Sequence, residues 1–110
     1  MGLFTKTTPE EKLIHYVSEL EKELALVIRL QDKANLMVNA NKDSLRYHTH
    51  NVMDTIKSIT KLANKNPIIP FADPTFTFLN KEYKLSSIIG LAQQKIKTSE
   101  GLLRVVGVKL

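Results

Sequence analysis

The sequence contains no cysteine and no tryptophan, and it has only four glycines and four prolines. Without thiols the chain has no disulfide, no cysteine nucleophile and no thiolate-bound zinc, a composition that fits a reducing compartment. No apolar run reaches the roughly 18 residues of a membrane span, and the first residues lack the charged-then-apolar plan of a signal peptide. We therefore expect a cytoplasmic protein without a membrane span.

The remaining composition is that of an ordinary folded chain with an uneven charge. Hydrophobic residues make up 43% and charged residues 25% of the sequence, which predicts a single folded domain over residues 1–110. Residues 1–41 carry five basic and six acidic side chains, whereas residues 42–110 carry eleven basic and five acidic ones. The net charge of +5 therefore belongs to the second part, where an anionic partner would be attracted.

Thr8, Pro9 and Glu11 predict the start of a long helix, because they supply a cap, a first helical residue and the acidic end of a capping box. Apolar residues then recur at steps of four and three, the spacing of a helix packed along its length in coiled-coil fashion. Gln31 is the one polar residue of this seam; it either bonds across the core or lies at a wet edge, and we favour the wet edge. The expected core or interface positions are Leu13, Val17, Leu20, Leu24, Val27, Ile28 and Leu30.

Asparagines in residues 39–42 predict the end of this helix, because asparagine tolerates the left-handed conformation that closes a helix. Asp43 or Ser44 would cap a second helix, which stops before Pro67 because a proline disfavours helix at the residue before it. The two helices should form an antiparallel hairpin with a short turn.

The expected lengths of the two helices differ. They span about 32 and about 22 residues, or roughly 48 and 33 Å. The shorter helix would leave Leu13, Ile14 and Val17 uncovered, so that either the rest of the chain or a second subunit must cover them. Leu3 and Phe4, in the short lead before the helix, could also fold back onto the bundle.

After a proline-punctuated connection over residues 67–74, residues 76–85 alternate in the manner of strands around Asn80 and Lys81. We expect a small β-hairpin at about 75–85, placed as a cap over the helix ends. Ser86 or Ser87 then caps a third helix that runs to about Thr98, while residues 99–110 are compatible with helix, strand or tail. The predicted fold is all-α or mainly α: a long antiparallel helical hairpin, a third helix and this hairpin.

The histidines give little indication of metal chemistry. His48 and His50 are two apart on a helix, so their side chains diverge by about 200° and do not suit one metal ion. A histidine on a helix of a small bundle resembles the histidine phosphotransfer domains, which would make His50 a phosphoryl acceptor. Those domains usually follow the histidine with a lysine and a glycine, whereas Asn51 follows here.

A basic face suggests another class of partner. Lys57, Lys61 and Lys65 are spaced four apart on the second helix, and Arg46 precedes them. Such a stripe can follow phosphates, although lysines opposite an apolar seam are also what any water-facing helix carries. It makes a nucleic-acid-binding accessory protein the main alternative.

The sequence thus predicts a small protein without enzymatic activity, cofactor or metal, which works through protein–protein contact. The unmatched first helix favours self-association, most simply as a symmetric dimer that completes a larger bundle. Nucleic acid binding and, further behind, histidine phosphotransfer are the other possibilities.

Overall fold

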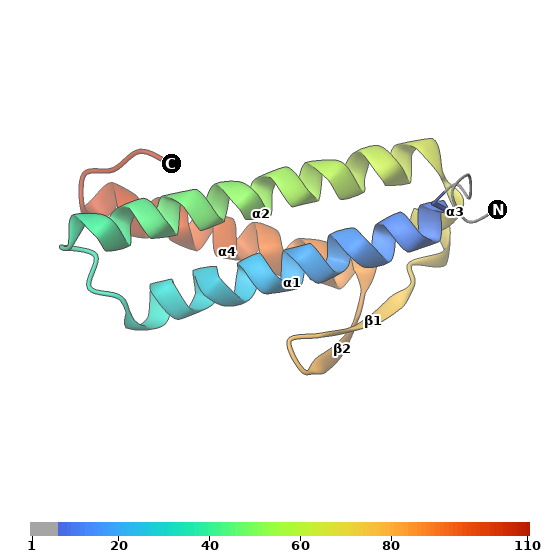
Figure 1. Cartoon of the computed structure of the whole chain (residues 1–110), viewed down its shortest axis with the longest axis horizontal. Helices are drawn as coiled ribbons and strands as arrows, with labels where there is room; N and C mark the ends of the chain where they lie inside the picture. Colours follow the sequence, from blue (N-terminus) through green and yellow to red (C-terminus); the bar gives the residue numbers. More distant parts are fainter. Residues whose placement is uncertain (1–6) are drawn as a thin grey trace.

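The computed structural model describes residues 7–110, which fold into a bundle of three long helices with a small β-hairpin on its side (Figure 1). The elements are α1 (Pro9–Lys33), α2 (Asn39–Lys65), α3 (Ile68–Ala72), β1 (Thr75–Phe78), β2 (Lys81–Lys84) and α4 (Leu85–Val105). Helices α1 and α2 are antiparallel, and α4 packs against both of them. The predicted mainly α fold is therefore confirmed. No helix in residues 7–110 has both the length and the apolar character needed to cross a membrane.

Helix α1 begins as predicted. The Thr8 hydroxyl accepts from the backbone N–H of Glu11 at 3.1 Å, and the Glu11 carboxylate accepts from the backbone N–H of Thr8 at 3.3 Å. This capping box satisfies N–H groups that have no partner within the helix, and Pro9 at the first helical position loses nothing by lacking an N–H. The postulated packing of Leu3 and Phe4 lies outside the described residues.

The predicted boundary between the first two helices is wrong. Helix α1 ends at Lys33, and residues 39–42 begin α2 instead of closing α1. Asn35 explains the break, because its side chain accepts from the backbone N–H of Met37 at 3.0 Å and its carbonyl accepts from the Asn41 amide at 2.9 Å. Asparagine side chains compete with helix in this way. Asp43 and Ser44 lie inside α2 and do not cap it.

The corrected boundary removes the length mismatch between the two helices. Helix α1 has 25 residues and α2 has 27, so the hairpin covers α1 to its first turns. Leu13 and Val17 are accordingly buried within the single chain, at 3% and 4% exposure. Of the two alternatives left open by the sequence, the rest of the chain therefore covers these two residues, without a second subunit.

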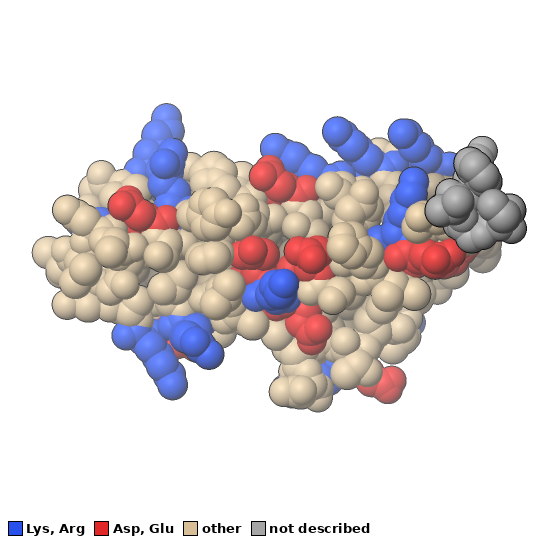
Figure 2. Space-filling view, in the orientation of Figure 1, with Lys and Arg blue, Asp and Glu red and all other residues tan. Residues whose placement is uncertain are grey.

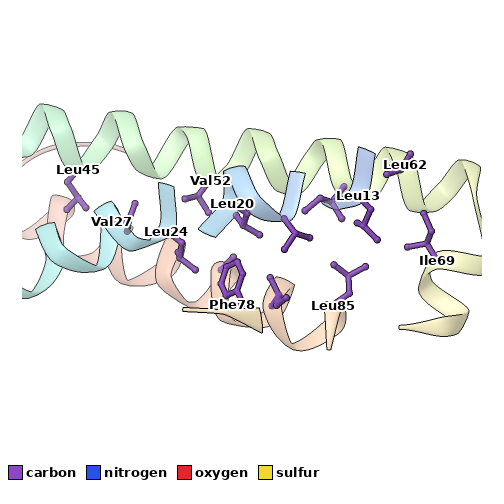
Figure 3. Close-up of a cluster of buried hydrophobic side chains, with 14 of the residues drawn as sticks. Leu13, Leu20, Leu24, Val27, Leu45, Val52, Leu62, Ile69, Phe78 and Leu85 are labelled. Atoms are coloured by element: carbon purple, nitrogen blue, oxygen red, sulfur yellow. The ribbon is translucent and has the colours of Figure 1, made fainter. Parts of the chain in front are cut away.

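The core is one apolar seam along the inside of the three long helices (Figure 3). Leu20 and Leu24 are fully buried, and Leu13, Val17 and Val27 nearly so, which confirms these five predicted positions. Ile28 and Leu30 are instead half-buried at the margin of the core. The other elements contribute Leu45, Val52, Ile59, Leu62, Ile69, Phe78, Leu85, Ile88, Ala92 and Leu103.

A polar junction crosses this core near one end. The Gln31 amide donates to the Ser99 hydroxyl and to the Lys95 carbonyl, both at 2.8 Å, and the Thr49 hydroxyl donates to Ser99 at 2.8 Å. Gln31 therefore bonds across the core, and the wet-edge interpretation is wrong. Because Ser99 and Thr49 are fully buried, an out-of-register packing of the helices would leave their hydroxyls unpaired, at a cost of about 1–3 kcal/mol each.

The β-hairpin turns one residue earlier than predicted, at Leu79 and Asn80, both of which have positive φ. This register places Phe76 opposite Tyr83 and buries Phe78 completely. The left-handed backbone at Leu79 is unfavourable for a branched side chain, and its N–H is held by the Glu21 carboxylate at 2.7 Å. The hairpin consequently lies along the side of α1, not over the helix ends as predicted (Figure 1).

Helix α4 continues to Val105, beyond the predicted end near Thr98. Its last turn closes at Gly107, which has φ of 80°, and the Val108 N–H donates to the Leu103 carbonyl at 2.8 Å. This is the closing pattern that favours glycine after a helix. Gly101 does not interrupt the helix.

Replacing Leu24 with alanine tests the seam. Leu24 is fully buried, so its truncation should lower the free energy of unfolding by about 2–5 kcal/mol, measured by urea denaturation. The control is Val105→Ala, at a side chain that is 85% exposed, which should change the free energy by no more than about 0.5 kcal/mol. Equal effects of the two substitutions would contradict the described core.

Candidate functional site

An apolar concavity lies at the end of the bundle where α1 begins. It has a volume of about 260 Å³ and lies between the first turns of α1, helix α3 and strand β1. Glu10 on the rim is its one charged residue. We call this cavity the end pocket; it is lined by Glu10, Leu13, Ile14, Ile68, Ile69, Ala72, Pro74 and Phe76.

Helix α3 forms one wall of the end pocket and also carries an exposed aromatic residue. Ile69 is 4% exposed and anchors this short helix in the hydrophobic core, to which Leu62 and Leu85 also belong (Figure 3). Phe71 is two residues further, so its side chain points about 200° away from Ile69 and is 83% exposed. Ile68 lines the pocket, is 63% exposed and precedes Phe71 by three residues, which makes the two side chains neighbours on α3. An apolar cavity and an apolar projection therefore adjoin on one surface.

Asp73 holds α3 in place. It follows α3 with a left-handed backbone, at φ of 45°, and its carboxylate accepts from the Ser86 N–H at 2.8 Å and from the Ser86 hydroxyl at 2.7 Å. The hydroxyl and the N–H of Ser86, with the charge of Lys84 adding to them, hold the pKa of the Asp73 carboxyl below its ordinary value of 3.8. Asp73 thus ties the wall of the end pocket to the first turn of α4.

Ile14, on the flank of the predicted seam, is left uncovered by residues 7–110. The sequence places it beside Leu13 on the flank of the core, yet it is 59% exposed at the mouth of the end pocket. The other large apolar residues with high exposure lie on the α1–α2 loop, at Tyr47 and at Val105. Scattered exposed apolar residues are normal on protein surfaces, whereas a group around a cavity is characteristic of a binding site.

The predicted basic residues lie on the outer face of α2. Lys57, Lys61 and Lys65, which we call the basic stripe, are all exposed, and Figure 2 shows basic side chains along the edge formed by α2 and acidic ones over α1. Arg46 is about 16 Å along the helix from Lys57. Its Nε donates to the Lys109 carbonyl at 3.0 Å, so that it also fastens the chain that follows α4.

His48 and His50 are both held by polar contacts within the fold. His48 Nδ1 lies 2.6 Å from the Glu23 carboxylate, which also accepts from the Asn51 amide at 3.2 Å. His50 Nε2 lies 2.6 Å from the main-chain oxygen of Leu110, so one of its ring nitrogens is engaged within the fold. Within residues 7–110 no group of three or more His, Asp or Glu side chains is arranged to hold a metal ion.

Replacing Asp73 with asparagine should weaken the attachment of α3 to α4, and the resulting loss in the free energy of unfolding should depend on pH. Because the folded pKa is lowered, the charged carboxylate stabilises the fold above pH 3.8, and this contribution is lost as the pH falls through the folded pKa. Asparagine tolerates the same backbone conformation. In urea denaturation, the free energy of unfolding of the wild type should therefore exceed that of Asp73→Asn by more at pH 7 than at pH 2.5. A difference that is equal at both values would contradict this role.

Comparisons with known proteins find no relative of this chain. No protein-family model matches the chain, and neither the characterised proteins nor the solved structures include a match. The functional argument therefore starts from the end pocket and the basic stripe.

Proposed function

We propose that this chain is a protein-binding module, without enzymatic activity, whose end pocket receives an apolar side chain of its partner. The observation that carries the proposal is the cavity of about 260 Å³ with seven apolar lining residues and exposed Ile14 and Ile68 at its mouth. Binding sites in proteins are concave and mainly apolar, with few polar groups. Acid–base catalysis needs a correctly placed titratable group within reach of its substrate, and Glu10 on the rim is the one such group here.

The size of the pocket sets the expected strength of the contact. One leucine or phenylalanine side chain buried in it would contribute about 1.5–3 kcal/mol. Most of that gain is offset by the loss of translational and rotational freedom on association. The pocket would thus anchor a partner whose remaining affinity comes from the surrounding surface.

The proposal is tested with N-acetyl-phenylalaninamide as a minimal apolar probe, followed by methyl NMR. The probe should shift the methyl signals of Leu13, Ile14 and Ile69, with a dissociation constant of roughly 10 mM or weaker. Ala72 lines the pocket and is exposed, so Ala72→Leu should fill the cavity and abolish these shifts without unfolding the chain.

Val105→Ala serves as the matched control for the probe experiment, because Val105 is equally apolar and exposed but lies near the far end of α4. It should leave the shifts unchanged. Shifts that are as large in Ala72→Leu as in the wild type, or that centre on other residues, would contradict the proposal.

A second candidate function is binding of a nucleic acid along α2. It is favoured by the exposure of all three lysines of the basic stripe, none of which forms an ion pair within residues 7–110. Tyr47, 63% exposed beside Arg46, would offer a ring on which a base can stack. Asp54 on the same helix would weaken this attraction.

A charge reversal separates the two candidates. If α2 binds nucleic acid, Lys57→Glu with Lys61→Glu should weaken binding of a fluorescent single-stranded oligonucleotide at least tenfold at low salt, because two phosphate contacts become repulsive. Lys12→Glu with Lys97→Glu makes the same change in net charge on α1 and α4 and should have little effect. Similar losses in both double variants, or no binding by the wild type, would exclude a site on this stripe.

A further inference from the structure

We infer that the partner of the end pocket is a second copy of this chain, with Phe71 of each copy inserted into the pocket of the other. This inference rests on the proposed function of the pocket and names its occupant. The surface carries both halves of such a contact side by side: an apolar cavity and an aromatic side chain that is 83% exposed.

The geometry favours a two-fold arrangement. Phe71 is absent from the lining of the cavity, and it projects from the outer side of the same short helix that forms the pocket wall. It therefore does not fill the pocket of its own chain. A two-fold axis beside α3 makes each copy donate Phe71 and accept Phe71, which is the self-complementary pattern of a closed symmetric dimer. A cavity of about 260 Å³ is large enough for a phenyl ring.

The charges around the pocket do not oppose this pairing. Glu10 lies on the rim, while Lys65 ends α2 three residues before Ile68 and is exposed. Where the rim of one copy meets the α3 side of the other, the opposite charges of Glu10 and Lys65 would attract each other across the interface. Such rim pairs contribute to orientation more than to affinity.

The area of the patch limits the strength of the dimer. Ile14, Ile68, Phe71 and the pocket make up a surface of a few hundred Å², and stable complexes bury about 800 Å² on each partner. We therefore expect a reversible dimer with a dissociation constant between about 0.1 and 1 mM.

Sedimentation velocity from about 1 µM to about 1 mM tests the inference with variants that separate the two halves of the contact. Phe71→Ala removes the projection and keeps the pocket, whereas Ala72→Leu fills the pocket and keeps Phe71. Each variant alone should dimerise at least tenfold more weakly than the wild type. Their equimolar mixture should regain part of the association, because one Phe71 can again enter one open pocket. Val105→Ala should behave as the wild type.

Three results would overturn the inference: a wild type that stays monomeric, a Phe71→Ala variant that dimerises as the wild type does, or a mixture that associates no better than its components. Circular dichroism checks that the two variants keep their helices, as is expected at exposed positions. Repeating the N-acetyl-phenylalaninamide experiment on Phe71→Ala distinguishes a failure of the dimer from a failure of the end pocket to bind an apolar side chain. A monomeric wild type whose pocket still takes the probe refutes the dimer and leaves the protein-binding proposal standing, whereas loss of both refutes both.

Discussion

Helix α1 must be covered on two sides, and the arrangement of the other elements follows from this constraint. Leu20 and Leu24 have no contact with water because α2 covers one side of α1 and α4 covers another. Near the start of α1, Ile69 of the five-residue helix α3 and the β-hairpin add to the cover from the last turns of α2. Such a small element buries Leu13 but leaves Ile14 at the edge of a cavity. The end pocket, which is the candidate binding site, is thus a consequence of the small cover near the start of α1.

The parts of the fold that could be predicted are those encoded by local periodicity. The four-and-three spacing of apolar residues identified the seam of α1, and Thr8 with Glu11 identified its first turn, because both signals act within one or two helical turns. The β-hairpin was also predictable as an element. Its position was not, because Glu21 reaches the Leu79 N–H from a helix 58 residues away in the sequence.

The errors that mattered for function came from single side chains. Asn35 breaks the helix several residues before the expected position, and this makes α1 and α2 nearly equal in length. The length argument for a dimer fails as a consequence. Ile14 was nevertheless a usable signal, since an apolar residue on the flank of a seam needs a cover. The exposure of Phe71, by contrast, depends on the orientation of α3, which Ile69 and Asp73 set through contacts distant in sequence.

The central proposal is that another molecule of this chain covers the end pocket that residues 7–110 leave open. Isotope-filtered NOE spectroscopy on a mixture of labelled and unlabelled protein at high concentration tests it most directly. The account predicts intermolecular NOEs between the Phe71 ring of one copy and the methyl groups of Ile14 and Ile69 of the other. The absence of these NOEs, or intermolecular NOEs that arise only from other surfaces, would contradict it.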